Sequence, residues 1–306
     1  PRGIMQAKSQ DQTGREVLIM LCERTTEETI MDTGSIYEPK YDGTRIQTLK
    51  QNGKIKLINR YGNDKTYVFP EIVAELQSLP QNILILDGEI IAVDGHFNSL
   101  AKRNNLVDMK KIEARVKTIP CQYMIFDILQ CGEKKLTGAP LSVRKEILKT
   151  VIPEYVFFKH FKYVRNFTFE YLYSEVRKGK IEGIVAKKID SKYEPRRSQN
   201  WKKWRLEDTE DMEVLGFEYS DAIERPIRSL ICRDADGEEV GVSGLDIKEM
   251  GAVRKLFENT PHKKEGKKLY LINNVGKLYI EVTRYKDSMT GTRFPRFKRF
   301  KNGKMS

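Results

Sequence analysis

A lysine stands just before a tight turn in the segment EPKYDGTRIQTLK, which runs from Glu38 to Lys50. Asp42-Gly43 is typical turn chemistry, and the alternation from Ile46 onward predicts a strand of period two. Most lysines in such a place are solvated surface charges. A lysine amine whose pKa is lowered can instead act as a nucleophile. Asp42 is interpreted equally well as a turn former or as a catalytic carboxylate. The rest of the chain decides between the two interpretations of Lys40.

Six short groups of chemically useful residues follow one another along the chain. They are KYDGTR (Lys40–Arg45), NRYG (Asn59–Gly62), LDGEII (Leu86–Ile91), MIFDIL (Met124–Leu129), EGIVAKK (Glu182–Lys188) and NWKKWR (Asn200–Arg205). Each is weak alone, because Asp-Gly-Glu is usually a turn and a basic patch with tryptophan is usually a half-buried edge. In this order and spacing the set resembles the covalent nucleotidyltransferases, most closely the ATP-dependent DNA ligases. The segment DSKYEPRRSQNW (Asp190–Trp201) resembles bacterial end-joining and archaeal ligases in particular.

The resemblance implies a reaction in three steps that joins a 3′-hydroxyl to a 5′-phosphate at a nick. Lys40 would attack the α-phosphate of ATP, form a phosphoamide to AMP and expel pyrophosphate. The AMP would pass to the DNA 5′-phosphate, and the 3′-hydroxyl would then displace it. The amine must be unprotonated, although free lysine has a pKa of about 10.4. We expect Arg45, Lys187 and Lys203, or a bound metal, to lower that pKa and to stabilise the transition state.

The same resemblance implies which residues hold the nucleotide. Glu38 would accept a hydrogen bond from the adenine amino group. Phe126 would stack on adenine, with a core phenylalanine in an apolar strand as the alternative. Glu89 would bond the ribose hydroxyls. Arg45 and Arg60 would hold the sugar and phosphate of AMP, or the DNA phosphate at the nick.

Phosphate and metal contacts are implied at a second group of residues. Lys187 and Lys203 would contact the α-phosphate. Arg205 stands where these ligases usually have a lysine, and its planar fork differs in geometry from an ammonium group. Glu182, with Glu89, would hold a divalent metal, because hard oxygen ligands suit Mg²⁺. ATP and Mg²⁺ are therefore the expected cofactors, and Mn²⁺ is expected to substitute for Mg²⁺.

The final motif departs from the ligase pattern, which usually reads R-x-D-K near the C-terminus. In RFPRFKRFKNGK (Arg293–Lys304), Lys301 aligns with the arginine, Gly303 with the aspartate, and Lys304 alone matches. Either Lys301 and Lys304 orient the pyrophosphate or contact DNA, or self-adenylation is slow.

The charge of the chain predicts a polyanionic partner. The net charge is +12. Residues 1–207 hold 36 basic and 26 acidic side chains, and residues 208–306 hold 19 and 17. The last stretch, residues 290–306, has six basic residues and no acidic one. Phe294, Phe297 and Phe300 recur between these charges, which indicates a packed segment and also suits contact with phosphates. Nicked double-stranded DNA is the expected partner.

The length of 306 residues and the hydrophobic share of 39% predict two domains with real cores. We expect an α+β class: a nucleotidyltransferase (ATP-grasp-like ligase) domain over residues 1–207 with antiparallel sheets and helices, then an all-β domain of the OB-fold type over residues 208–306. A helix is predicted over Pro70–Leu79, with another capped by Ser142. Strands are predicted over ranges that include Ile83–Leu86, Glu89–Val93 and Gln122–Leu129.

Other features bound the setting of the protein. No apolar run approaches the ~20 residues of a membrane span. The four cysteines never form a C-x-x-C pair, which argues against a zinc site or a disulfide framework and fits a reducing cytoplasm. We expect a cytoplasmic monomer, nucleoid-associated if prokaryotic, with a viral origin also open, that serves DNA replication, repair or recombination.

Three other readings remain open at this stage. An RNA ligase and an mRNA-capping guanylyltransferase share the lysine motif. A non-catalytic DNA-end-binding relative would have kept the fold, and the atypical final motif is its only support. An NAD-dependent ligase is disfavoured, because that class carries additional domains with zinc-binding cysteines.

Overall fold

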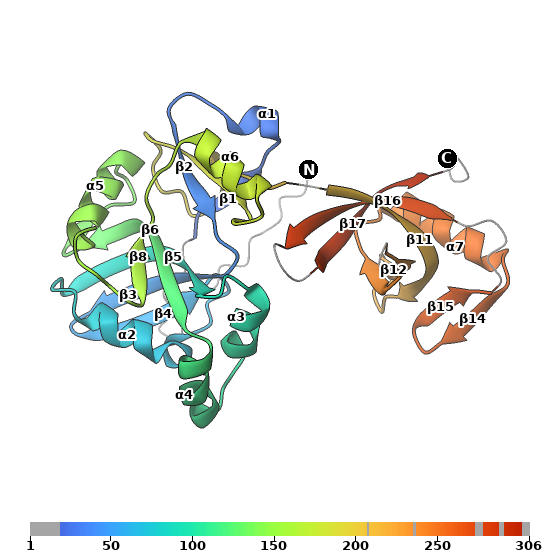
Figure 1. The fold of residues 1–306 in the computed structure, drawn as a ribbon, viewed down its shortest axis with the longest axis horizontal. Coiled ribbons are helices and arrows are strands. Elements are labelled where there is room, and N and C mark those ends of the chain that lie inside the picture. The colour runs from blue at the N-terminus through green and yellow to red at the C-terminus, as the bar shows by residue number, and fades with distance from the viewer. Residues whose placement is uncertain (1–18, 207, 235–236, 273–277, 288–290, 302–306) are drawn as a thin grey trace. The chain divides into compact units, whose positions relative to one another are not determined.

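The computed structural model describes residues 19–301 apart from 207, 235–236, 273–277 and 288–290. The chain divides into two compact units, residues 1–204 and residues 205–306 (Figure 1). The seam expected from the sequence lay slightly further along, between residues 207 and 208. No helix in the described part of the chain is long and apolar enough to cross a membrane.

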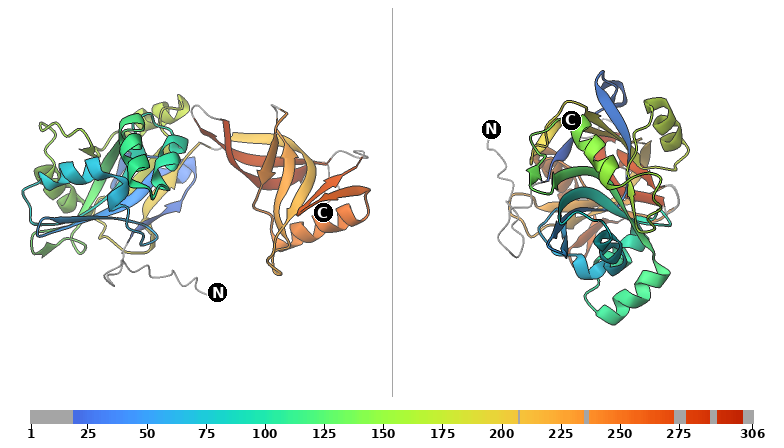
Figure 2. Two further views of the ribbon diagram at one scale, coloured as in Figure 1. Left: turned by 90° about the horizontal axis from the view of Figure 1, so that it is seen from below. Right: turned by 90° about the vertical axis from the view of Figure 1, so that its left-hand side faces the viewer.

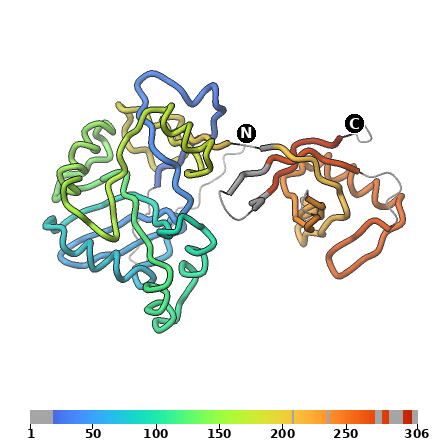
Figure 3. The backbone as a smooth tube through the Cα atoms, in the orientation of Figure 1, coloured from blue at the N-terminus to red at the C-terminus, as the bar shows by residue number. Residues whose placement is uncertain are grey.

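The first unit contains a four-stranded sheet built from both ends of its sequence. Its strand order is β1-β10-β9-β2, and the strands are β1 (Leu21–Arg24), β10 (Arg197–Trp204), β9 (Gly183–Lys188) and β2 (Ser35–Lys40). β1 runs parallel to β10, so the first and last strands of the unit lie side by side (Figure 3). Helix α6 (Phe169–Arg177) contacts β2 and β9, and the short α1 (Glu27–Ile30) contacts β10.

A second sheet in the same unit has six strands and carries most of the core. Its order is β4-β3-β5-β6-β7, with β8 beside β6. The strands are β3 (Thr44–Gln51), β4 (Lys54–Asn59), β5 (Ile83–Ala92), β6 (Cys121–Cys131), β7 (Lys134–Lys135) and β8 (Phe161–Tyr163). The helical elements are η1 (Thr66–Val68), α2 (Pro70–Gln77), α3 (Phe97–Asn104), α4 (Met109–Thr118) and α5 (Leu141–Val151). Apolar residues of α2 and α5 pack with those of the strands in one buried cluster.

Glycines in two of the motifs are needed because two chain segments approach closely. A Cβ atom at Gly43 would lie 2.2 Å from the carbonyl oxygen of Ile90, and one at Gly88 would lie 2.5 Å from that of Met124. No side chain fits at such distances. The glycines of the motifs YDG and LDGE therefore allow strands β3, β5 and β6 to pack closely together next to the candidate site residues.

The second unit is a β barrel, and its described residues also include one helix. Its strands are β11 (Asp208–Tyr219), β12 (Ile227–Arg233), β13 (Glu239–Val242), β14 (His262–Glu265), β15 (Lys268–Leu271), β16 (Tyr279–Asp287) and β17 (Gly291–Lys301). Five of them pair in the order β13-β12-β11-β16-β17. The hairpin of β14 and β15 joins the sheet through the pairing of β15 with β11. The amide of Phe297 donates to the Ser243 carbonyl at 2.8 Å, and a parallel bridge joins Ser243 to Arg296. These contacts close the ring, as expected for an OB-type barrel.

Helix α7 (Ile247–Glu258) packs against one side of this barrel (Figure 2) through Met250, Val253 and Phe257. The sequence analysis did not predict it. The sequence feature that marks the start of this helix is a capping box. The Asp246 side chain accepts a hydrogen bond from the Glu249 amide, and the Glu249 side chain accepts one from the Asp246 amide.

The predicted elements are otherwise close to the observed ones. The helix predicted over Pro70–Leu79 is α2, and the two strands predicted within residues 83–93 form one continuous strand, β5. Ser142 is not an N-cap: α5 already begins at Leu141, and Pro140 occupies the cap position. The expected packing of the basic tail is confirmed for Phe297, which is buried, and for Phe300, which lies against the same core. The side chain of Phe294 lies outside the described residues.

Candidate active site

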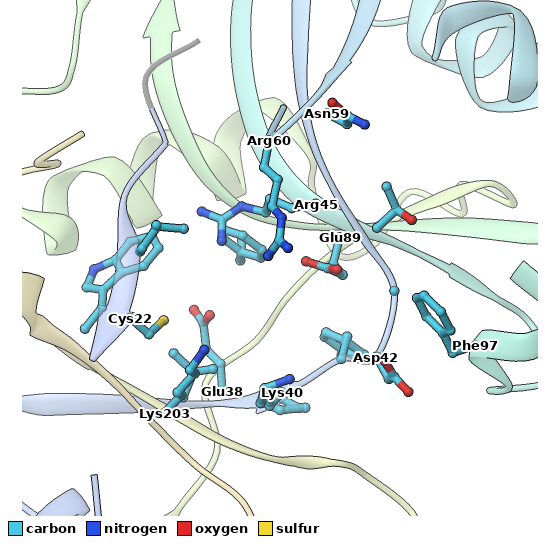
Figure 4. Close-up of a pocket in the computed structure, with 18 of the residues that line it drawn as sticks. Cys22, Glu38, Lys40, Asp42, Arg45, Asn59, Arg60, Glu89, Phe97 and Lys203 are labelled. Atoms are coloured by element: carbon cyan, nitrogen blue, oxygen red, sulfur yellow. The ribbon is translucent and has the colours of Figure 1, made fainter. Parts of the chain in front are cut away.

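A pocket of about 470 Å³ opens in the first unit, and both of its sheets contribute to its wall. Glu38, Lys40 and Lys203 lie on one side of it, and Arg45, Arg60 and Glu89 lie across from them (Figure 4). The sequence motifs were scattered over more than half of the chain. The structure brings members of all six to one cavity. EGIVAKK contributes Val185 and Lys187, whereas its Glu182 pairs with Lys40 without lining the cavity.

Lys40 is the last residue of β2, where the strand pairs with Gly183 at the start of β9. Its ammonium group forms an ion pair with the carboxylate of Glu182, the residue just before β9. Both side chains are half-buried. Lys40 is therefore not a solvated surface charge in a turn: it is held by a strand and by a specific carboxylate at the pocket. For the amine to attack an electrophile, this ion pair must first open.

Glu38 lies two residues before Lys40 on the same strand and is almost fully buried. One carboxylate oxygen pairs with Lys145, and the other lies 2.6 Å from the ammonium group of Lys187. Burial disfavours the ionised form of Glu38, but the two ammonium groups outweigh it and hold the pKa below its usual value. Two cations thus share one buried anion. Burial lowers the pKa of Lys145, and repulsion from Lys187 acts in the same direction.

Lys187 also lies over aromatic faces. Its ammonium nitrogen is 4.1 Å from the ring centroid of Phe126 and 4.2 Å from that of Trp201. The guanidinium of Arg45 lies 4.5 Å from the Phe126 centroid. A cation over an aromatic face is attracted by the negative charge of that face. The ring expected to stack on a base is therefore covered by the protein's own cations in this structure.

Arg45 is fixed by a fork-shaped ion pair. Its Nε donates to one oxygen of Asp87 at 2.6 Å, and its Nη2 donates to the other at 2.8 Å. The Tyr193 hydroxyl donates to the same carboxylate, which is fully buried. Burial acts against the charged form of Arg45, but Asp87 outweighs it and raises its pKa further. Arg45 is therefore a permanent cation with a fixed direction.

Glu89 is a half-buried carboxyl of the pocket wall on β5. Burial raises its pKa from 4.5 to about 7, the charges of Glu182 and Asp87 add to the rise, and Arg45 and Lys40 oppose it. Two carboxylates that repel each other at one place suit a divalent cation, which would relieve the repulsion. The described residues hold no group of three or more metal-binding side chains. Mg²⁺ needs no such group, because it takes one or two carboxylates together with phosphate oxygens. Glu89 and Glu182 thus fit a Mg²⁺ site.

The remaining cations divide into those at the pocket and those away from it. Burial lowers the pKa of Lys203, and the nearby ammonium group of Lys40 adds to this effect. Arg60 lines the pocket from the end of β4 and lies over the ring of Tyr61. Arg205 follows β10 and is not among the lining residues. Lys301 pairs with Asp211 within the second unit, and Lys304 lies outside the described residues.

The sequence analysis did not identify three buried residues that support the pocket residues. Lys145 and Tyr193 were not singled out, and Asp87 was quoted only as part of a motif. All three are buried. Lys145 and Asp87 pair with the pocket residues Glu38 and Arg45, and Tyr193 donates to Asp87. For Lys145 the signal was its helical spacing from Leu141 and Leu148, which places it on the buried face of α5. That signal does not identify the ion-pair partner of Lys145, because Glu38 lies far from it in the sequence.

The pocket has the elements of covalent nucleotidyl transfer: a lysine amine, cations for phosphate, and a carboxylate pair for a metal. The family model of the ATP dependent DNA ligase domain matches residues 19–205. The chain therefore belongs to the ATP-dependent DNA ligase family.

Individual relatives agree with this assignment. A DNA ligase of Methanocorpusculum labreanum is 27% identical over 310 residues, which cover 95% of this chain and 56% of that protein. The chain thus spans about half the length of this curated relative. Two solved structures share the fold. A Lig E DNA ligase has a TM-score of 0.67 and 17% identity, and covers 92% of this chain and 98% of its own. The ligase domain of M. tuberculosis LigD has a TM-score of 0.52 and 20% identity, and covers 92% and 94%. These matches extend over both units and support the α+β class with a C-terminal OB fold.

Proposed function

We propose that this chain seals nicks in double-stranded DNA at the expense of ATP, with Lys40 as the nucleophile. The observation that carries the proposal is the position of Lys40 in the pocket wall, ion-paired with Glu182 and surrounded by Arg45, Lys187 and Lys203. A lysine held this way lies between groups that bind phosphate and groups that bind a metal.

Different residues of the pocket would contact the base, the ribose and the phosphates of ATP. Adenine would enter over Phe126 and displace the ammonium group of Lys187 that now lies over this ring. Glu38 would accept a hydrogen bond from the adenine amino group, and Glu89 would bond the ribose hydroxyls. Lys187 and Lys203 would then bind the α-phosphate, and Arg60 would bind the nucleotide or the DNA phosphate.

Attack by Lys40 requires two changes in its surroundings. The ion pair with Glu182 must open, and the ammonium group must lose a proton. A Mg²⁺ ion held by Glu182 and Glu89 would supply charge neutralisation at the phosphate oxygens. The Lys40 nitrogen forms the new N–P bond as the bond between the α-phosphorus and the bridging oxygen breaks, and pyrophosphate leaves. AMP is then transferred from Lys40 to the 5′-phosphate of the nick, and the 3′-hydroxyl expels it.

The second unit supports contact with DNA. It is an OB-type barrel, a fold that binds oligonucleotides. Lys298, Arg299 and Lys301 on β17 each form an ion pair with an acidic residue of the same unit. In the Lys301–Asp211 pair the two side chains are 35% and 49% exposed. Pairs exposed to this degree are worth little, so DNA or pyrophosphate could replace Asp211 as the partner of Lys301.

The test is formation of the covalent adduct followed by nick sealing. The wild-type chain is incubated with ATP, dATP, GTP or NAD, and the adduct is detected by intact-mass spectrometry. We expect an AMP adduct with ATP, none with NAD, and joining of a nicked duplex. Lys40→Ala should abolish the adduct, and Lys54→Ala should not, because Lys54 is an exposed lysine at the far end of β4. A GMP adduct in place of AMP would indicate a capping enzyme. Binding of nicked DNA with no adduct at all would reject ligase activity.

A further inference from the structure

The buried cluster of Glu38, Lys145 and Lys187 holds more positive charge than one carboxylate needs. Glu38 and Lys187 line the pocket, whereas Lys145 does not. Lys145 comes from helix α5 and reaches Glu38 from behind, and its ammonium group also donates to the carbonyl of Val164 at 3.0 Å. It lies 5.0 Å from the centroid of Tyr163. Any effect of Lys145 on a bound nucleotide must therefore pass through Glu38.

Lys187 cannot keep its present place if the base stacks on the face of Phe126 that this lysine covers. Its ammonium nitrogen lies 4.1 Å from the Phe126 centroid, which is about the spacing of a stacked aromatic base. A base on this face and the ammonium group would occupy the same volume. A lysine that can reach a phosphate also binds it more strongly than it binds an aromatic face. Lys187 must thus leave Phe126, and its ion pair with Glu38 is lost or weakened at the same time.

An unpaired Glu38 would then be a buried carboxylate next to the base. Burial of an unpaired charge is strongly unfavourable, so such a group takes up a proton or rotates toward water. Either change would spoil its use as a charged acceptor for an amino group. Lys145 prevents this, because it pairs with Glu38 from outside the pocket and is itself held by Val164 and Tyr163, which do not line the pocket.

We propose that Lys145 is a positioning residue for base selection. It is the permanent counter-ion that keeps Glu38 charged and directed at the exocyclic amino group of adenine while Lys187 moves to the α-phosphate. The inference rests on the proposed function, since it concerns the same nucleotide pocket. It assigns the two lysines that share Glu38 to different tasks: Lys187 exchanges partners during the reaction, and Lys145 does not.

The experiment compares two nucleotides on the same protein sample. ATP and purine riboside triphosphate differ by the 6-amino group alone, and each is used below saturation to measure the rate of adduct formation on Lys40. For the wild type we expect ATP to react roughly 10- to 100-fold faster, as for a hydrogen bond to a charged acceptor. In Lys145→Met the preference should fall to about 3-fold or less. The ratio of rates does not depend on the folded fraction, because both nucleotides see the same folded molecules.

Further variants keep the result unambiguous. Lys149→Met changes an exposed lysine one turn further along α5 and should keep the wild-type ratio. Lys145→Arg retains the cation and should keep most of the preference for ATP. If the methionine variant is insoluble, Lys145→Gln takes its place, since it also removes the charge and should also lower the preference to about 3-fold or less. Equal losses with both nucleotides in these Lys145 variants would show a structural role alone and overturn the proposal. So would a wild type that does not discriminate between the nucleotides. A wild type that forms no adduct with either nucleotide would reject the proposed function, and the inference with it.

Discussion

Replacing Glu89 by glutamine should stabilise the first unit at alkaline pH and at the same time impair adduct formation. Burial raises the pKa of Glu89 from 4.5 to about 7, with further repulsion from Glu182 and Asp87. The folded chain therefore binds this proton more tightly than the unfolded chain does. As the pH rises from about 4.5 to 7, the folded state loses stability, because it must accept an ionised carboxylate in a place that disfavours it.

The magnitude follows from the two pKa values. A rise from 4.5 to about 7 corresponds to about 3 kcal/mol between the protonation states. Glutamine cannot ionise, so the variant should gain up to about 3 kcal/mol in unfolding free energy near pH ~8. The gain should shrink to less than about 1 kcal/mol near pH ~5, where Glu89 is protonated in the folded chain. Glu89 is half-buried, so solvent screening makes the larger figure an upper value.

The assay uses the location of the tryptophans. The chain has two, Trp201 and Trp204, and both lie on β10 of the first unit. Urea unfolding followed by tryptophan fluorescence therefore reports on this unit separately. Glu113→Gln, which changes an exposed carboxylate on α4, is the control and should have no effect at either pH. The reasoning is refuted if Glu89→Gln is equally stable to the wild type near pH ~8, or if its gain is the same at both pH values.

Two other predictions test the metal site and the basic tail. Glu182→Ala should slow adduct formation, and higher Mg²⁺ or Mn²⁺ should restore part of the rate; no metal response would indicate that Glu182 serves Lys40 alone. Changing Lys301 and Lys304 together to alanine should slow self-adenylation while sparing the sealing of DNA that already carries a 5′-AMP. Substitutions are preferable to truncation there, because β17 closes the barrel. An equal loss in both reactions, growing with salt, would instead indicate phosphate contacts with duplex DNA.

Local sequence signals predicted the strands, because strands depend on neighbours in the chain. The assignment of Lys40 as the nucleophile rested on the order of six distant motifs and stays a prediction. Asp42-Gly43 fixes the turn after Lys40, and apolar runs give β5 and β6. The steric reason for Gly43 became visible only in the structure, where Ile90 approaches from another strand. Helix α7 shows the opposite case: its capping box was present in the sequence, but short strand patterns on both sides hid it.

The partners of buried charges could not be predicted, because they come from distant segments. Asp87 precedes Glu89 in the same motif, yet one carboxylate holds Arg45 by a fork and the other faces the pocket with a raised pKa. Asp87 and Glu89 are two residues apart on β5. The difference therefore comes from their neighbours, because Tyr193, from beyond β9, and Arg45 both pair with Asp87. The sequence identifies Asp87 and Glu89 as carboxylates, whereas the packing of the two sheets determines which groups each carboxylate contacts.

The pocket is assembled from ion pairs that a nucleotide must rearrange. Lys40 is held by Glu182, and Lys187 is held by Glu38. Each of these lysines has a carboxylate partner before the triphosphate arrives, so neither ammonium group is buried without a counter-charge. Under the proposed function, bound phosphate would offer Lys187 a new partner, and a divalent cation on Glu182 would release Lys40. Arg45 differs, because its fork on Asp87 lies outside this exchange. The proposed reaction would thus use two kinds of cation: fixed ones to position the nucleotide, and exchangeable ones to bind phosphate and free the amine.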